Sequence, residues 1–95
     1  MLALAIDETA LGPVHPGVAT DLNNLAGLYY HQRKFVEAEA LLNRAQAIWE
    51  ATLGPSHPNV GTVMENRSKL LRAMNHEAEA TELETRARSI RDLQP

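Results

Sequence analysis

Four histidines are the residues of this chain best suited to chemistry, because imidazole binds metal ions and exchanges protons near neutral pH. His15 and His57 lie 42 residues apart, and each stands directly before a proline that opens a helical pattern. Two ligands of one zinc ion must bring their nitrogens within about 4 Å, whereas stacked helices lie about 8–10 Å apart. We therefore expect both to be N-caps, with a shared metal site as the alternative. His31 and His76 fall in or beside predicted turns, where solvated polar residues are expected.

The remaining groups that could support catalysis do not form a recognisable site. An enzyme needs a nucleophile beside a base, a carboxylate pair in a cleft, a phosphate-binding loop or a cofactor motif. Glutamates at 37 and 39 and at 77 and 79 form two acidic pairs near predicted helix starts, where the helix dipole also explains them. The chain has no cysteine, which removes disulfides, thiolate zinc sites and cysteine nucleophiles. We expect no catalytic residue, no metal and no cofactor.

Length and composition bound the elements that must carry these residues. The chain has 95 residues, 44% of them hydrophobic and only 4% aromatic, so its core must come from Leu, Ala, Ile and Val. That composition favours close-packed helices, and we expect one all-α domain over residues 1–95. The net charge of −3 gives no basic field for nucleic acid. The apolar stretch 1–6 has no positive flank and is followed by two acidic residues, so we expect neither a signal peptide nor a membrane span, and a cytoplasmic protein.

An internal repeat organises the chain. The segment Leu-Gly-Pro-Val-His-Pro-Gly-Val at 11–18 recurs as Leu-Gly-Pro-Ser-His-Pro-Asn-Val at 53–60. When residues 1–53 are laid over residues 43–95, 19 of the 53 positions are identical. A repeat of this length indicates an array of similar structural units rather than one irregular fold.

Apolar spacing within each unit predicts a pair of helices, which we call A and B. The first repeat spans 16–53, with a break at 32–34, and the second spans 58–92, with helices over 58–74 and 77–92. Residues 1–11 predict one further helix B that lacks its partner. The predicted order is therefore five helices, B-A-B-A-B. The apolar row of the first helix A is Val18, Leu22, Leu25 and Tyr29.

These paired helices with small-residue positions resemble the tetratricopeptide repeat, and the 42-residue period with its Leu-Gly-Pro-x-His-Pro connector is similar to the kinesin-light-chain type. The resemblance covers nearly the whole chain, and it implies a right-handed solenoid of antiparallel helix pairs. Small side chains let helix axes approach to about 8–10 Å. The residues that match the family positions are Leu22, Leu25, Ala26, Tyr29, Ala38, Leu42 and Ala45.

The resemblance also implies a concave groove, lined by the A helices, that holds an extended peptide or a partner helix. An asparagine amide suits this role because it offers both a donor and an acceptor to a peptide backbone. Asn24 and Asn66 are repeat equivalents that could form a ladder of two amides. The alternative is an ordinary solvated helix face. The predicted groove residues are Thr20, Asn23, Asn24, Gly27, Tyr30, His31, Thr62, Asn66 and Lys69.

Charge and aromatic residues add two further expectations for this groove. The resemblance implies that kinesin-light-chain grooves favour acidic peptides, and Lys69 with Arg72 makes the second helix A compatible with them, although Glu65 lies nearby. Tyr30 is either a peptide anchor or a residue packed on the next helix. Trp49, late on a helix B, either covers the connector or belongs to an interface.

The two ends of the array differ in polarity. The second repeat has Arg67, Ser68 and Glu84 where the first has apolar or small residues, so we expect a capping repeat with a polar outer face. At the other end, Leu2 and Ile6 lie on an apolar helix face with no preceding helix A. Either upstream repeats cover that face or a second copy packs on it in a two-fold dimer, and we predict self-association through residues 2–11.

These observations together predict a non-enzymatic module that binds a peptide or helix of a protein partner in the groove of the A helices. The alternative is a structural module that drives self-association or caps a longer array and has no dedicated peptide ligand. We expect no nucleic acid and no membrane among its partners.

Overall fold

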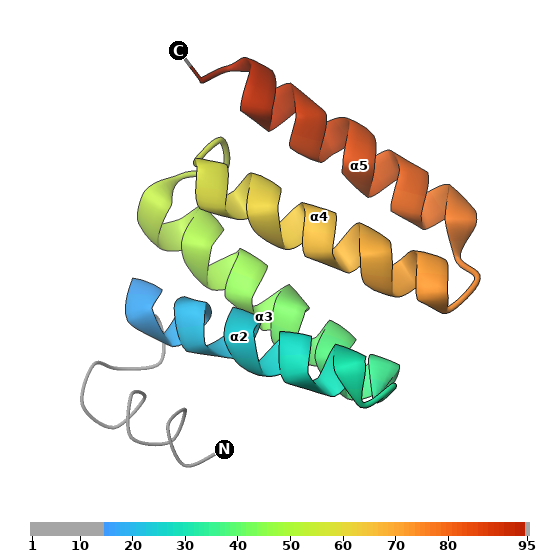
Figure 1. Cartoon of the computed structure of the whole chain (residues 1–95). Helices are drawn as coiled ribbons and strands as arrows, with labels where there is room; N and C mark the ends of the chain where they lie inside the picture. Colours follow the sequence, from blue (N-terminus) through green and yellow to red (C-terminus); the bar gives the residue numbers. More distant parts are fainter. Residues whose placement is uncertain (1–14, 95) are drawn as a thin grey trace.

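The structure, a computed structural model, describes residues 15–94, which form four α-helices joined by short turns (Figure 1). The helices are α2 (Pro16–His31), α3 (Phe35–Leu53), α4 (Pro58–Ala73) and α5 (Glu77–Asp92). Helix α2 packs on α3 and α4 packs on α5, and α3 also packs on α4, so that two helix pairs lie side by side. This arrangement confirms the predicted all-α helix-pair solenoid. The further helix predicted at residues 2–11, with Leu2 and Ile6, lies outside the described residues.

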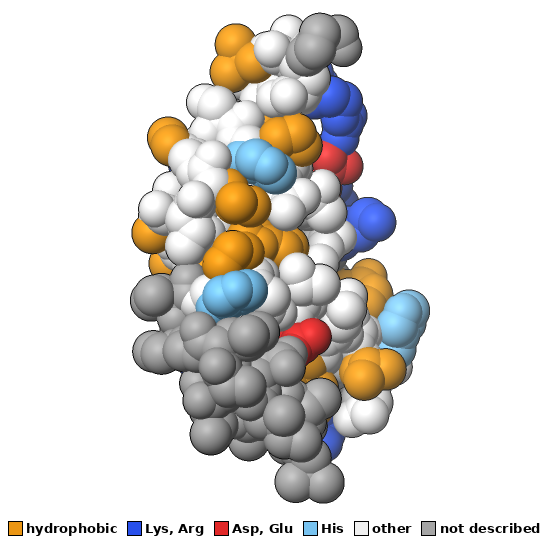
Figure 2. All heavy atoms as spheres, turned by 90° about the vertical axis from the view of Figure 1, so that its left-hand side faces the viewer, with side chains coloured by type: hydrophobic (Ala, Val, Ile, Leu, Met, Phe, Trp, Pro, Cys, Tyr) orange, Lys and Arg blue, Asp and Glu red, His pale blue; other side chains and the backbone are white. Residues whose placement is uncertain are grey.

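The two A helices, α2 and α4, begin in the same way. The Nδ1 atom of His15 accepts a hydrogen bond from the backbone N–H of Gly17 at 2.9 Å, and Nδ1 of His57 accepts one from Asn59 at 3.0 Å. A proline follows each histidine, where its missing N–H costs nothing. The predicted caps are thus confirmed. Figure 2 faces the end of the molecule at which these helices begin, where histidine side chains lie beside a cluster of hydrophobic ones.

The turns within the two repeats also share one geometry. Arg33 and Asn75, which are 42 residues apart, both adopt a left-handed backbone, with φ of 62° and 64°. The next residue donates its N–H to the carbonyl five positions earlier, as Lys34 does to Tyr29 at 2.8 Å, and the equivalent bond of the second turn has the same length. This bond pattern is that of a Schellman motif, which satisfies carbonyls left open at a helix end. It explains why both A helices end at equivalent places.

One apolar cluster runs through all four helices. Ala38 and Ala45 of α3 and their repeat equivalents in α5, Ala80 and Ala87, are all buried, and such small side chains permit the close approach of helices that the sequence predicted. Trp49, near the end of α3, is 4% exposed, and its Nε1–H donates to the carbonyl of Pro16 at 3.3 Å. Trp49 therefore covers the start of its own repeat. No helix within residues 15–94 is both long and apolar enough to cross a bilayer.

Two polar residues expected on the outer end of the array lie inside it instead. Ser68 is 2% exposed, and its hydroxyl donates to the carbonyl of Glu65 at 2.8 Å. Arg67 is partly buried and donates through Nη1 to Oε1 of Gln46 on α3 at 2.8 Å, and desolvation lowers the pKa of its guanidinium. The expectation of an outer face at these positions was therefore wrong, because Ser68 is buried and Arg67 lies where α4 meets α3. Glu84 is the exception, since it is partly exposed on α5.

Candidate functional site: a groove between the A helices

A pocket opens between α2 and α4, with α3 at its base. We call it the central pocket, and it encloses about 210 Å³. Five of its residues come from α2, one from α3 and three from α4, so both repeats are needed to form it. The lining residues are Asn23, Ala26, Gly27, Tyr30, His31, Leu42, Asn66, Lys69 and Leu70.

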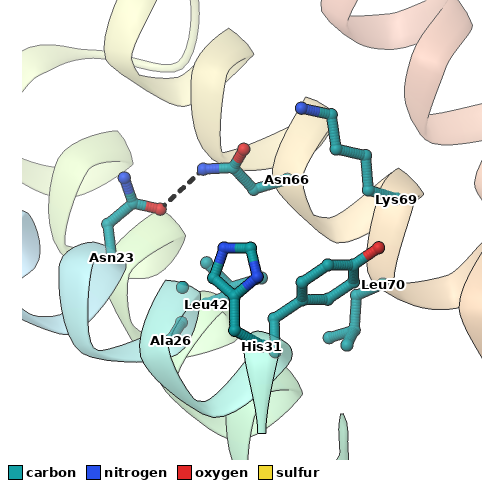
Figure 3. A pocket seen from close by; sticks show the side chains of 9 residues that line it. Asn23, Ala26, His31, Leu42, Asn66, Lys69 and Leu70 are labelled. Atoms are coloured by element: carbon teal, nitrogen blue, oxygen red, sulfur yellow. Dashed lines mark hydrogen bonds between the residues drawn. The ribbon is translucent and has the colours of Figure 1, made fainter. Parts of the chain in front are cut away.

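Polar side chains surround the opening of the central pocket (Figure 3). Asn66 on α4 donates through Nδ2 to Oδ1 of Asn23 on α2 at 2.9 Å, so the two amides connect the A helices directly. The His31 ring and the Lys69 side chain reach the same opening from α2 and α4. The opening therefore presents amide donors and acceptors together with a cationic amine.

The base of the central pocket is apolar. Ala26, Leu42 and Leu70 are all buried, with Leu70 only 1% exposed. Gly27 widens the pocket on the α2 side, because a Cβ atom added there would meet nothing within 4 Å. A ligand lying on the amides would thus find apolar surface beneath it, which is the usual composition of a binding cleft.

A second pocket of about 360 Å³ adjoins the first, since Tyr30 and His31 line both. We call it the aromatic pocket, because the Tyr30 and Phe35 rings lie 5.7 Å apart at its wall. The Arg33 guanidinium lies 5.6 Å from the centre of the Phe35 ring, within the range of a cation–π interaction. The two pockets together make a groove that continues from α4 to the turn between α2 and α3. Its fifth lining residue is Ala73 at the end of α4.

The charged residues that line this groove are all basic. Lys69 and Arg33 line the two pockets beside His31, and no carboxylate is among the residues that line either. Arg72, which the sequence grouped with Lys69, instead forms ion pairs with Glu77 and Glu84 of α5. The hydrogen bonds that the Arg72 guanidinium donates to the carboxylates of Glu84 and then Glu77 raise the pKa of Arg72. Its charge is therefore compensated within the second repeat.

Six of the nine predicted groove residues line the central pocket and three do not. Thr20 and Thr62 donate their hydroxyls to carbonyls of their own helices, at 3.4 and 3.2 Å. Asn24 is exposed beside the pocket, and the partner of Asn66 is Asn23 rather than the repeat equivalent Asn24. Each residue turns a helix by about 100°, so neighbouring asparagines face different directions. The two-amide ladder therefore consists of Asn23 and Asn66.

The structure adds groove residues that the sequence did not single out. Leu70, Arg33, Phe35 and Ala73 line the two pockets, and the sequence treated Ala26 and Leu42 as packing positions alone. For Leu70 the sequence did offer one signal, because the repeat places it at the position of Leu28 in the first unit. The surroundings of these two leucines nevertheless differ, since Leu28 is 60% exposed whereas Leu70 is buried.

Both carboxylates of the acidic pair at 77 and 79 have structural partners. Glu77 pairs with Arg72, and Glu79 lies 3.4 Å from Nδ1 of His76. The described part of the chain contains no group of three or more histidines and carboxylates that could hold a metal ion. The groove is therefore the feature with the clearest capacity to bind a ligand.

Comparison with known proteins agrees with the helix-pair fold. A family model described as tetratricopeptide repeat matches residues 22–92. Nephrocystin-3 of Xenopus laevis and of Mus musculus are each 51% identical to this chain over 43 residues, and Nephrocystin-3 of Homo sapiens is 49% identical over the same length. The matched stretch covers 45% of this chain but 3% of each relative, so the chain corresponds to a small part of those proteins.

Proposed function

Because this chain belongs to the tetratricopeptide repeat family, we propose that it binds an extended peptide of a protein partner in the groove between α2 and α4. Repeats of this family mediate protein–protein interaction in general and act as scaffold modules without catalysis. The partial match to Nephrocystin-3 fits a role of this kind. Our proposal that the ligand is an extended peptide bound in this groove rests on the residues that line it.

The pair of amides above an apolar base carries this proposal. An extended peptide leaves its backbone N–H and C=O groups unpaired, whereas a helix satisfies them internally. Asn66, hydrogen-bonded to Asn23, lies at the opening where such groups would pass, and its amide has both donor and acceptor atoms. Side chains of the peptide would reach the apolar base at Leu42 and Leu70. We therefore propose an extended peptide rather than a partner helix.

The charge of the groove supports an acidic peptide. Lys69 and Arg33 contribute positive charge and no carboxylate lines the two pockets, so an anionic side chain would meet attraction without a nearby repulsive group. The 42-residue period and the connector before each helix A support the kinesin-light-chain type, whose resemblance implies the same preference. We expect binding to weaken as salt concentration rises.

A peptide library tests this proposal. The full chain is used to select binders from a random peptide library displayed on phage, and the affinity of a selected peptide is measured by fluorescence polarisation. Asn66→Ala should weaken binding about two- to twelvefold through one lost hydrogen bond. Asn43→Ala is the matched control, because Asn43 is exposed on α3 and lines neither pocket. Equal affinities for wild type, Asn66→Ala and Asn43→Ala would overturn the proposal.

Self-association is the second candidate function, and the exposure of Leu28 favours it. The equivalent Leu70 is 1% exposed, whereas Leu28 on the flank of α2 is 60% exposed. A second copy packing on this flank would bury that side chain. We expect light scattering at high micromolar concentration to report a dimer, and Leu28→Glu or Ile6→Glu to reduce it to a monomer. A monomeric wild-type mass would rule this candidate out.

A further inference from the structure

We propose that Asn23 is a positioning residue, which orients the amide of Asn66 for the backbone of the bound peptide. This inference rests on the proposed function. It differs from a direct role for both asparagines, because Asn23 would act through Asn66 instead of through the ligand. The observation that carries it is the 2.9 Å bond from Nδ2 of Asn66 to Oδ1 of Asn23.

The bond is particular to the junction between the two repeats. It joins residues 43 positions apart, one more than the repeat period, so it does not follow from the repetition of the sequence. The repeat equivalent of Asn23 is Glu65, which instead forms an ion pair with Arg91 of α5. The equivalent of Asn66 is the exposed Asn24. An amide held by a second amide thus occurs at position 66 and not at position 24 within the described residues.

Holding the amide decides which of its atoms meets the ligand. The terminal torsion of asparagine is broad and nearly two-fold, so a free amide exchanges its donor and acceptor faces. Donation from Nδ2 of Asn66 to Asn23 fixes one orientation, which leaves Oδ1 of Asn66 and the amino group of Asn23 without a partner among residues 15–94. Immobilising a side chain costs about 0.5–1.5 kcal/mol on binding, which is two- to twelvefold in affinity. Prior fixation of Asn66 removes that cost.

The first test needs no ligand and uses NMR of the full chain labelled with ¹⁵N. The side-chain amide of Asn66 should be ordered in wild type and mobile in Asn23→Leu, which keeps a similar volume but removes the acceptor. Asn23→Asp retains an acceptor oxygen and should restore the order. Asn24→Leu is the matched control and should leave Asn66 unchanged. Equal order of this amide in wild type and Asn23→Leu would overturn the inference.

The second test is a double-mutant cycle with the library-selected peptide. Asn23→Leu should weaken binding two- to twelvefold in the wild type and have no further effect in the Asn66→Ala background, because the residue it positions is gone. Additive losses would mean that Asn23 contacts the peptide itself, and would overturn the positioning role while leaving the groove intact. A library that yields no binding peptide would overturn the proposed function and the role of Asn23 together.

Discussion

Gly27 allows stability and binding to be changed in opposite directions. It lies within α2, is exposed, and lines the central pocket. A Cβ atom added there would meet nothing within 4 Å, so the folded state accepts alanine without strain. Glycine inside a helix is about 0.8–1.0 kcal/mol less favourable than alanine. Gly27→Ala should therefore raise the free energy of unfolding by about 1 kcal/mol, and the Tm by about 4–8 °C.

Gly61 provides the matched control for this substitution. It lies on α4 away from the central pocket, and an added Cβ would stand 3.4 Å from Cγ2 of Ile90. Its repeat equivalent in α2 is the fully buried Ala19, so an alanine already occupies that position in the first repeat. Gly61→Ala should stabilise the fold by a similar or smaller amount and leave peptide affinity unchanged. Thermal and urea unfolding followed by circular dichroism measure the stability of both variants, and fluorescence polarisation measures their affinity for the peptide.

A longer side chain at position 27 should raise the stability of the fold and lower its affinity for the peptide. Gly27→Gln keeps most of the gain in helix propensity, because glutamine is a good helix former. Its side chain would enter a pocket of about 210 Å³ and exclude the peptide, so affinity should fall about tenfold or more while the Tm rises. Unchanged affinity for Gly27→Gln would refute the placement of the ligand. A lower Tm for Gly27→Ala would show that another part of the protein approaches this glycine closely.

Three further predictions concern packing and helix starts, and urea unfolding measures each of them. Leu70→Ala should cost about 2–5 kcal/mol, whereas Leu28→Ala should cost less than about 0.5 kcal/mol; equal costs would mean that the flank of α2 is covered. Trp49→Phe should cost about 0.5–1.5 kcal/mol through the lost bond to the α2 start, and no loss would show that this bond is not formed in solution. His57→Ala removes the cap of α4 and should cost about 0.5–2 kcal/mol, and an unchanged stability would contradict the capping role.

Local signals in the sequence were sufficient for the helix boundaries. The predicted helices over 58–74 and 77–92 agree with α4 and α5 to within one residue, because each boundary depends on a cap or turn of a few residues. His57 before a proline starts a helix through its own side chain, and Asn75 supplies the left-handed turn that ends one. Interactions of this kind are complete within one segment of the chain.

The same local signals could not predict the contacts between repeats. Whether Asn23 or Asn24 meets Asn66 depends on the rotation and shift of one helix pair against the next, which no local pattern encodes. Arg67 shows the same limit, because its charge predicted an exposed position and its partner Gln46 lies on another helix. A polar side chain can be buried wherever a partner satisfies it, and that partner is known only once the repeats are stacked.

The stacking of neighbours also has a consequence for how the chain folds. Helices α2 and α3 pack together, as do α4 and α5, and α3 with α4 joins the pairs, so the principal contacts connect helices adjacent in the chain. Short loops close at little entropic cost, and chains rich in local contacts fold in microseconds to milliseconds. Within residues 15–94, the α3–α4 pair has neighbours on both sides, whereas α2 and α5 each pack mainly on one helix. Amide hydrogen exchange should therefore be slowest in α3 and α4, and opening should begin at the outer helices α2 and α5.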